Sequence, residues 1–332
     1  MVKKALIFGV TGQDGTYLAQ YLLKKNYIVY GTSRSFSHRT SLRLKKMGIY
    51  SDIKKFKVKL GNPKSVQKAI QTSKPDEIYN LAGISSVSEP FNKIFQICKE
   101  NTIGVLTILE EIRKNSPHSR FFQASSAEMF GSQCGMLDEK SEFKPNTPYA
   151  ISKVFSHNMT KTYRENFGIF TCNGILFNHE SPLRGENFVT KKITKSLTHI
   201  NLKKLKQFNL GNINAKRDWG FAGDYVKAMW LMLQQKSPDD FVIATGKSHS
   251  IKDFLDVASF QCKLDWKHFV NMDNSLKRSI DLPDRIGNSN KAKKILKWKP
   301  KMSFENLIKL MVKSDFEESL NLTKKQQFLK NF

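Results

Sequence analysis

Long apolar segments and paired cysteines are both missing from this 332-residue chain. No run of about 18 apolar residues occurs, so no segment is predicted to span a membrane. The four cysteines, Cys98, Cys134, Cys172 and Cys262, stand far apart, with no CxxC pair and no histidine at ligand spacing. This spacing argues against a structural zinc site and against a disulfide framework. We therefore expect no bound metal, no membrane contact and a reducing, cytoplasmic location.

Acidic residues are also scarce, with 29 Asp and Glu against 55 Lys and Arg, which gives a net charge of +26. A positive potential of this size attracts polyanions and raises the hypothesis of nucleic-acid binding. The lysines, however, are spread over most predicted surface helices. The densest segment, 290–301, reads as one amphipathic helix with a solvated basic face. We predict no nucleic-acid partner; the charge indicates a lysine-rich surface, or a mild attraction of an anionic nucleotide substrate.

Apolar and β-branched runs alternate with polar or helix-periodic segments through the first half of the chain. Such alternation predicts right-handed crossovers and a parallel sheet covered by helices on both faces. The fold class is therefore α/β, a Rossmann-type doubly wound parallel sheet, in which ligands bind beyond the carboxyl ends of the strands. The predicted strands cover residues 5–10, 27–33, 55–60, 77–83, 120–126 and 170–177.

This rhythm breaks after about residue 178, where a loop rich in turn residues, NHESPLRGENF, precedes a helix-like segment. We predict a dinucleotide-binding domain over residues 1–178, to which 215–245 returns. Residues 179–332 are expected to form mainly a smaller C-terminal substrate-binding domain.

Three glycines at a spacing of three, Gly9, Gly12 and Gly15, follow the first apolar run in GVTGQDGTYL. Without Cβ atoms the backbone can bend sharply and an anion can approach its N–H groups. The apolar-periodic helix that follows directs its positive end at the same place. With a strand before it and a helix after it, this loop predicts the pyrophosphate site of a dinucleotide.

The end of the second predicted strand indicates which dinucleotide binds. An acidic residue there would bond a ribose 2′-hydroxyl and mark NAD. The chain has TSRSFSHRTSLRL instead, and the guanidinium groups of Arg34 and Arg39, with the hydroxyls of Ser33 and Ser35, suit a 2′-phosphate. We therefore predict NADP, although Arg39 alone reads equally well as an exposed helix charge.

Tyr149 and Lys153 lie four residues apart in PYAISK and so share one helical face, with Pro148 suited to the first turn and Asn146 or Thr147 to the cap. A nearby ammonium favours phenolate and is expected to lower the tyrosine pKa. Such a tyrosine can take the proton of an alcohol while a hydride leaves the same carbon.

The fifth predicted strand ends in ASSAEMFG. Ser126 is placed to bond the same reacting hydroxyl as Tyr149. Glu128, two residues on, points the same way from an extended backbone. A carboxylate beside a bound sugar can move a carbon-bound proton and then protonate a departing hydroxyl. The alternative is that Glu128 is a solvated loop acid.

Taken together, these motifs resemble the extended short-chain dehydrogenase/reductase family over nearly the whole chain, and within it the GDP-mannose 4,6-dehydratases. The segments that carry the resemblance are GVTGQDGTYL, SRSF, NLAGISSV, QASSAEMFG, PYAISK, GILFNHESPLRGENFVTKKI, GNINAKRDWG and KAKKILKWKPKMSFENL. The resemblance implies a redox-neutral lyase acting on a GDP-sugar with bound NADP. Hydride leaves C4 of the hexose, a proton leaves C5, water leaves from C6, and the hydride returns to C6.

Residue roles follow from the resemblance position by position. Tyr149 is implied as the C4 base, Lys153 as its modulator, Glu128 as the C5/C6 acid–base, and Ser126 as a hydroxyl where threonine is usual. Implied cofactor contacts are Gly9, Thr11, Gly12, Gln13, Asp14, Gly15, Arg34, Ser35, Asn62, Leu81, Ala82, Gly83, Ser85, Tyr149, Lys153, His179 and Arg184. Implied substrate contacts are Ser86, Ser126, Glu128, Asn178, Lys192, Arg217 and Arg278.

Several positions depart from the family pattern, including Asn62 with Pro63 near the adenine and Ile84 with Ser86 near the nicotinamide. GDP-D-mannose is the expected substrate, but another GDP-hexose or GDP-heptose stays open. So do a 4-epimerase or 4-keto reductase activity and a catalytically silent dinucleotide sensor. The family also implies a homodimer or homotetramer, with residues 34–45 as the candidate contact.

Overall fold

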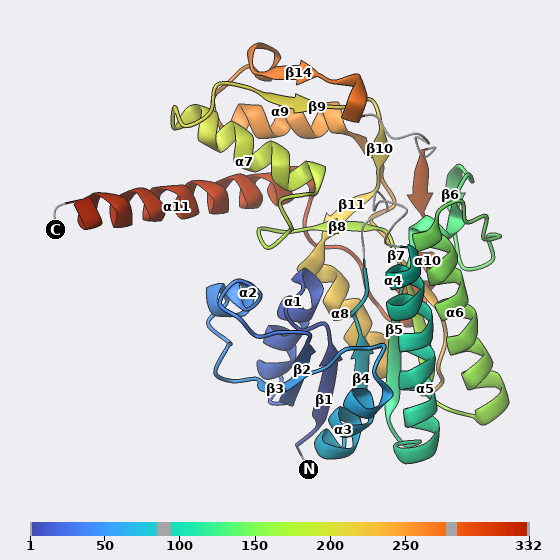
Figure 1. The fold of residues 1–332 in the computed structure, drawn as a ribbon. Coiled ribbons are helices and arrows are strands. Elements are labelled where there is room, and N and C mark those ends of the chain that lie inside the picture. The colour runs from blue at the N-terminus through green and yellow to red at the C-terminus, as the bar shows by residue number, and fades with distance from the viewer. Residues whose placement is uncertain (1, 85–93, 277–283, 331–332) are drawn as a thin grey trace.

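The protein is described here by a computed structural model that covers residues 2–84, 94–276 and 284–330 (Figure 1). Seven parallel strands form one sheet in the order β12-β7-β5-β4-β1-β2-β3. The strands are β1 (Lys4–Phe8), β2 (Ile28–Ser33), β3 (Lys54–Lys57), β4 (Glu77–Asn80), β5 (Arg120–Ser126), β7 (Thr171–Leu176) and β12 (Phe241–Ile243). The predicted α/β, Rossmann-type sheet is confirmed, and all six predicted strands are present.

The seventh strand, β12, was not predicted. It pairs in parallel with β7 at the edge of the sheet, and all three of its residues are buried. Three apolar residues are too few to show the sequence periodicity that distinguishes a strand from a buried helix. Together with α8 (Ala222–Leu233) it packs against the first part of the chain. The division of the chain into two domains stays a prediction.

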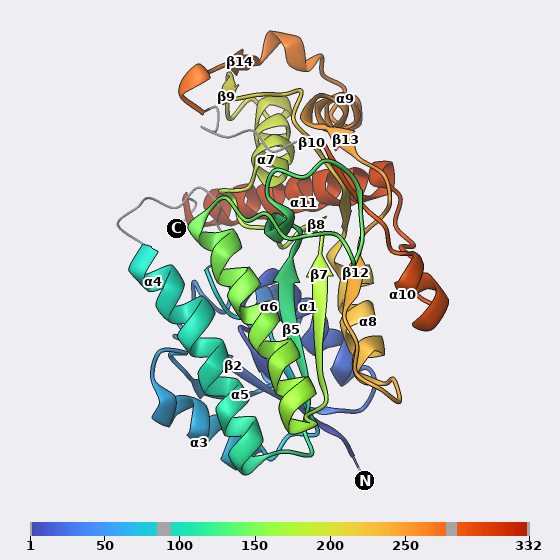
Figure 2. The ribbon, with the colours of Figure 1, turned by 90° about the vertical axis from the view of Figure 1, so that its right-hand side faces the viewer.

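Helices cover both faces of the sheet (Figure 2). On one face α8 packs against α1 (Gln13–Leu23), and their apolar sides share a core with β1 and β7. On the other face lie α3 (Pro63–Ser73), α5 (Gly104–Asn115) and α6 (Pro148–Phe167), around a second core. A sheet that is buried on both faces leaves its carboxyl edge as the place for a ligand.

Helix α6 starts and stops where its sequence dictates. The Thr147 hydroxyl accepts a hydrogen bond from the Ala150 N–H at 3.1 Å, and Pro148 occupies the first turn. The helix ends at Gly168, whose φ of +64° is left-handed. These signals fix the register of the helix that carries Tyr149 and Lys153.

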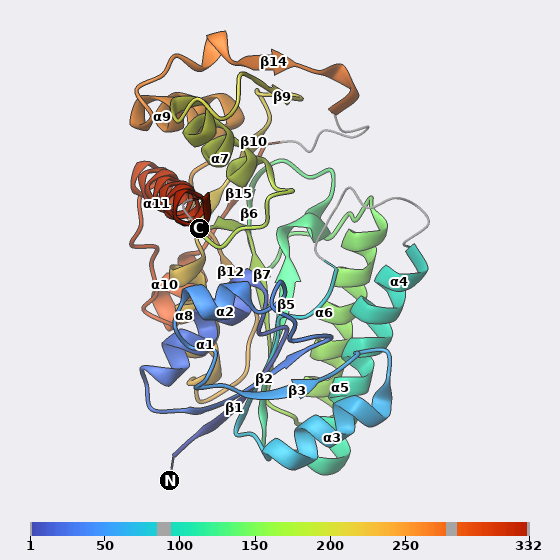
Figure 3. The same cartoon turned by 60° about the vertical axis from the view of Figure 1, so that its left-hand side comes forward.

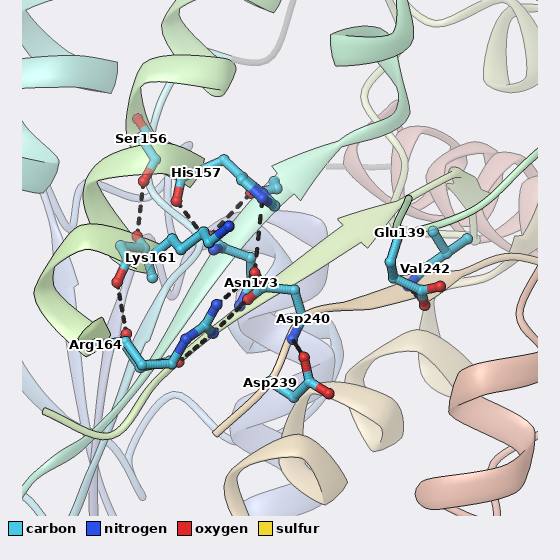
Figure 4. Close-up of polar contacts among 12 residues, drawn as sticks. Glu139, Ser156, His157, Lys161, Arg164, Asn173, Asp239, Asp240 and Val242 are labelled. Atoms are coloured by element: carbon cyan, nitrogen blue, oxygen red, sulfur yellow. Dashed lines mark hydrogen bonds and ion pairs between the residues drawn. The ribbon is translucent and has the colours of Figure 1, made fainter. Parts of the chain in front are cut away.

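A buried polar network ties α6 to the sheet (Figure 4). Both nitrogens of the Arg164 fork donate to the Asp240 carboxylate at 2.8 Å. The same carboxylate accepts from the Asn173 N–H at 2.8 Å and lies 3.8 Å from His157. Since Asn173 belongs to β7 and Asp240 directly precedes β12, this network joins the helix to two neighbouring strands.

A lobe of further helices lies above the carboxyl edge of the sheet (Figure 3). Helices α7 (Val189–Asn201), α9 (Ile251–Gln261) and α11 (Phe304–Lys330) share a core that includes Trp219, Phe254 and Phe304. A buried ion pair between Lys191 and Asp315 joins α7 to α11. In the described part of the chain, no helix combines the length and apolarity needed to cross a bilayer.

Shorter elements complete the described part of the chain. There, four further pairs of strands occur: β8 (Asn178–Glu180) with β11 (Trp219–Phe221), β9 (Phe208–Leu210) with β14 (Val270–Met272), β10 (Lys216–Arg217) with β13 (His249–Ser250), and β6 (Gly135–Leu137) with β15 (Arg285–Gly287). The short helical segments are α2 (Leu42–Lys46), α4 (Ile94–Cys98), η2 (Lys99–Ile103), η3 (Ala127–Phe130), η4 (Trp266–His268), η5 (Asn274–Leu276) and α10 (Asn290–Ile295).

The prediction of one basic helix over 290–301 is wrong. Helix α10 ends at Ile295, and Lys297 adopts a left-handed φ of +53°. Trp298 then turns inward, where its indole N–H donates to the Asp224 carbonyl at 2.9 Å. Burial of this tryptophan against α8 overrides the helical pattern of the lysines around it.

Candidate active site

A cleft of about 500 Å³ opens between the carboxyl edge of the sheet and helix α7. Its walls come from both halves of the chain, as the resemblance implies. Fifteen of the predicted site residues line it: Gly12, Gln13, Asp14, Gly15, Leu81, Gly83, Ser126, Glu128, Tyr149, Lys153, Asn178, His179, Arg184, Lys192 and Arg217. The predicted contacts Ser85, Ser86 and Arg278 lie outside the described residues.

The three glycines of the first loop have different tasks. Gly9 has a φ of +85°, and a Cβ there would lie 2.9 Å from the Ala82 backbone. A Cβ on Gly15 would lie 2.3 Å from the Gly9 carbonyl oxygen, so it is excluded by the close packing of α1 on the loop. Of the three, Gly12 and Gly15 line the cleft. The glycines therefore shape a cradle at the start of α1, and only part of it faces a ligand.

Helix α1 begins at this cleft, which is lined by Gln13, Asp14 and Gly15 of its first turn. Its cap residue, Gly12, has no side chain that could accept from them. The first N–H groups of a helix have no partner within the helix, so the positive end of this 11-residue helix is suited to bind a phosphate. The cradle and this helix end fit a dinucleotide pyrophosphate. Among the residues in 2–84, 94–276 and 284–330, no group of three or more His, Cys, Asp or Glu is arranged to hold a metal ion.

The two side chains that follow Gly12, those of Gln13 and Asp14, bond to the segment that follows β7. The Gln13 amide donates to the His179 carbonyl at 3.1 Å and accepts from the Ser181 hydroxyl at 2.8 Å. The Asp14 carboxylate lies 2.9 Å from the His179 ring nitrogen. These contacts fix the start of α1 against β8, which closes the cradle on one side.

Several predicted cofactor contacts are not among the residues that line the cleft, namely Gly9, Thr11, Arg34, Ser35, Asn62 and Ala82. The Thr11 and Ser33 hydroxyls are 3.1 Å apart. Asn62 caps α3 by accepting from the Ser65 N–H. The Arg34 guanidinium is largely exposed and lies 3.2 Å from the Glu100 carboxylate. Gly9 and Thr11 follow β1, Arg34 and Ser35 follow β2, and Asn62 and Ala82 follow β3 and β4. The role of these six residues in binding stays a prediction.

Tyr149, Ser126 and Lys153 meet inside the cleft. The Tyr149 hydroxyl is hydrogen-bonded to Ser126. The Lys153 ammonium donates to the Ala124 carbonyl at 2.8 Å and lies 5.8 Å from the centre of the Tyr149 ring. Ser126 ends β5, while the other two side chains lie one turn apart on α6. The pair that the sequence predicted therefore faces the strand end that carries the serine.

The pKa of Tyr149 differs from the expectation. Burial raises it to about 12, the Ser126 hydrogen bond opposes this rise, and the charge of Glu128 adds to it. Burial also lowers the pKa of Lys153 to about 8. The sequence pattern predicted a lowered tyrosine pKa because it supplies the ammonium but not the low-dielectric surroundings, whose effect is larger.

Glu128 is buried in the wall of the cleft and is not the solvated loop acid that the sequence left open. It belongs to η3, directly after Ser126, and its N–H donates to the Ser126 hydroxyl at 3.2 Å. Its Oε1 accepts from Arg285 at 3.1 Å, while Oε2 has no hydrogen-bond donor among the described residues. Arg285 was missed by the sequence reasoning, because no motif surrounds it.

The fold and the site define a Rossmann-type enzyme with the Tyr–Lys pair of a short-chain dehydrogenase/reductase. The family model described as GDP-mannose 4,6 dehydratase matches residues 6–311. The chain therefore belongs to the GDP-mannose 4,6-dehydratase family. It is 45% identical to GDP-mannose 4,6 dehydratase 1 of Arabidopsis thaliana, over 98% of this chain and 92% of that protein.

Solved structures with the same fold are more distant in sequence. The UDP-glucose 4-epimerase of Thermus thermophilus, in complex with NAD, aligns with a TM-score of 0.83 at 19% identity, over 94% of this chain and 98% of the other. The structure of RMD from Pseudomonas aeruginosa, complexed with NADPH, aligns with a TM-score of 0.80 at 16% identity, over 96% and 100%. At these identities the likeness shows the fold.

Proposed function

We propose that this protein removes water from GDP-D-mannose to give a GDP-4-keto-6-deoxy sugar, with NADP bound throughout. The observation that carries the proposal is that the Glu128 side chain shares one cleft with Tyr149 and Lys153. A plain dehydrogenase needs the Tyr–Lys pair but has no use for a second, buried acid–base group beside it. Family membership and 45% identity to an Arabidopsis dehydratase support the same conclusion.

In this mechanism each side chain moves a proton at a defined atom of the sugar. Tyr149 takes the proton of the C4 hydroxyl, and Ser126 holds both oxygens in a hydrogen bond. Lys153 stabilises the phenolate that Tyr149 must become, offsetting the cost of burial. Once C4 is a ketone, the C5–H bond is acidic, and Glu128 accepts its proton and passes it to the C6 hydroxyl, which departs as water. When bound, a nicotinamide dinucleotide would supply the hydride acceptor at C4 and the hydride donor at C6. Hydride addition at C6 requires a proton at C5, and the proton that Tyr149 took from the C4 hydroxyl supplies it.

The substrate residues are proposed from their place in the cleft. Asn178 lines the cleft together with the proposed cofactor contact Arg184, while Lys192 and Arg217 come from the lobe. The basic side chains of Lys192 and Arg217 suit the diphosphate of a GDP-sugar. We propose NADP over NAD because β2 ends at Ser33 and is followed by Arg34, not by a carboxylate that would repel a 2′-phosphate.

The test is to mix the purified protein with GDP-mannose and no added reductant, and to follow the product by mass for loss of water. A parallel panel of GDP-hexoses and GDP-heptoses identifies the preferred sugar. In Glu128→Gln we expect C4 oxidation to proceed and water loss to stop, so reduced nicotinamide accumulates by absorbance. If turnover instead requires stoichiometric NADPH, the protein is a 4-keto reductase. If the product has the same mass as the substrate, the protein is a 4-epimerase.

We also propose a cytoplasmic homodimer or homotetramer that uses residues 34–45 as a contact. Exposed, free Cys98 and Cys134 support a reducing compartment. Residues 37–40 are exposed, and Leu42 is an apolar side chain that is 40% exposed in the same segment. Light scattering of Leu42→Glu tests the contact, and an unchanged molar mass would place the interface elsewhere.

A further inference from the structure

Arg285 approaches the acid–base carboxylate from behind the cleft. Its Nη2 donates to Glu128 Oε1 at 3.1 Å, and its Nη1 donates to the Ala127 carbonyl at 2.7 Å and contacts the Gly131 carbonyl at 3.5 Å. Glu128 lines the cleft, whereas Arg285 does not. The guanidinium therefore contacts backbone carbonyls at both ends of η3, the turn that carries Glu128. It does so from the side of this turn that does not line the cleft.

The position of Arg285 is itself fixed. It lies on β15, which pairs in parallel with β6, so that Arg285 is opposite Gly135. The Asp218 carboxylate accepts from the Gly287 N–H at 3.2 Å and from the Thr245 and Gly246 N–H groups at 2.9 Å. Because strand pairing and a buried carboxylate hold the backbone on both sides, the arginine fork has little freedom to follow a moving glutamate.

The Arg285–Glu128 pair differs in geometry from the buried Arg164–Asp240 pair of the same protein. In the Arg164–Asp240 pair, the two guanidinium nitrogens of Arg164 donate to the two carboxylate oxygens of Asp240, a bidentate contact. Arg285 gives Glu128 only one nitrogen, and Glu128 Oε2 is buried without a donor among the described residues. A buried carboxylate oxygen with no partner is costly and calls for an explanation. The explanation that we infer is that Oε2 must be free to accept a proton from the substrate.

We propose that Arg285 is a positioning residue that pins Oε1 of Glu128 and leaves Oε2 aimed at the C5–H and C6 hydroxyl of the bound sugar. This inference rests on the proposed function. Arg285 touches neither the sugar nor its C4 hydroxyl, so its effect is confined to the elimination half of the reaction.

The experiment separates the two halves in a single turnover. In Arg285→Met we expect the rate of C4 oxidation, measured by nicotinamide absorbance, to stay within about twofold of the native rate. The rate of water loss, measured by mass spectrometry, should fall about 100-fold. In Arg285→Lys, which keeps the charge, part of the lost rate should return. Arg164→Met is the matched control: it breaks a buried arginine–carboxylate pair outside the cleft, and is expected to lower stability but leave the ratio of the two rates unchanged.

Two further measurements keep the inference falsifiable if Arg285→Met folds poorly. Added guanidinium should rescue water loss in Arg285→Ala, which a general packing defect would not allow. Infrared difference spectra between the native protein and Glu128→Gln, recorded again in the Arg285→Lys background, should show the carboxylate bands move. The role of Arg285 would be overturned if Arg285→Met slowed both half-reactions equally. It would also be overturned if guanidinium did not restore water loss and the carboxylate bands did not move. Failure of the native protein to dehydrate any GDP-sugar would instead reject the proposed function.

Discussion

The His179 imidazole lies 2.9 Å from the Asp14 carboxylate and stacks on the Tyr225 ring at 4.5 Å. This contact joins the first turn of α1 to β8 across 165 residues of sequence. Burial alone would lower the pKa of His179, but the Asp14 charge and hydrogen bond outweigh it and raise that pKa. Burial works in the opposite direction on Asp14, and the His179 charge and hydrogen bond outweigh it, so the Asp14 pKa is lowered.

These two shifts define a pH window for stability. The Asp14 contribution is lost as pH falls through its lowered pKa, and the His179 contribution is lost as pH rises through its raised pKa. A double-mutant cycle with Asp14→Asn and His179→Asn should give a coupling energy of about 1–3 kcal/mol near pH 5.5, since the pair is partly buried. Urea unfolding at about pH 5.5 and about pH 9 measures it. A coupling energy that does not fall at the higher pH would contradict the ion pair.

Replacing Lys153 with methionine should separate stability from activity. The lysine pKa falls to about 8 in the folded protein because the side chain is buried. Its charged form therefore costs stability at neutral pH, and that cost disappears as pH rises from about 8 towards the unfolded value of about 10.4. We expect the free energy of unfolding of Lys153→Met to exceed that of the native protein by about 2 kcal/mol at pH 7. Near pH 10 the two free energies should be equal. Turnover should fall at least 100-fold, about the value of a lost acid–base partner. A variant that is less stable than the native protein at pH 7 would show that the Ala124 hydrogen bond matters more than the buried charge.

Glu100 should weaken NADP binding by holding Arg34. The carboxylate is mostly buried and lies 3.2 Å from the exposed guanidinium. Since exposed pairs of this kind are worth up to about 1 kcal/mol, Glu100→Gln should tighten NADP⁺ up to about fivefold. The NAD⁺ dissociation constant should not change, because NAD⁺ has no 2′-phosphate. Calorimetric titration measures both, with Glu165→Gln, which removes an exposed helix pair on α6, as the control. Equal tightening of both dinucleotides would show that Arg34 does not read the 2′-phosphate.

The protein should lose stability in mild acid through His157. Burial lowers the pKa of this histidine to about 4, although the neighbouring Asp240 charge opposes the shift. The folded state thus binds fewer protons than the unfolded chain between about pH 6.5 and pH 4, so stability falls as pH drops through that range, by up to about 3 kcal/mol. His157→Gln should flatten this loss in urea unfolding. His268→Gln, at a histidine that is 76% exposed, is the control. An unchanged slope in His157→Gln would assign the acid sensitivity to another group.

The sequence by itself determined the sheet and the cradle, because both are written in local patterns. Apolar runs bounded by turn residues marked six of the seven strands, and the spacing of Gly9, Gly12 and Gly15 marked the start of α1. The same is true of Tyr149 and Lys153, since one helical turn guarantees that they share a face. For the strand β12 the pattern was too short to read.

Only the tertiary structure decided what surrounds the proposed catalytic groups. Arg285 meets Glu128 across 157 residues, through the pairing of β15 with β6, and no spacing rule reaches that far. The raised pKa of Tyr149 likewise depends on burial, which is a property of the folded cleft and not of the Tyr–Lys spacing. Local patterns fix where the backbone turns and which face a side chain takes. The electrostatic setting of that side chain comes from segments brought together by folding.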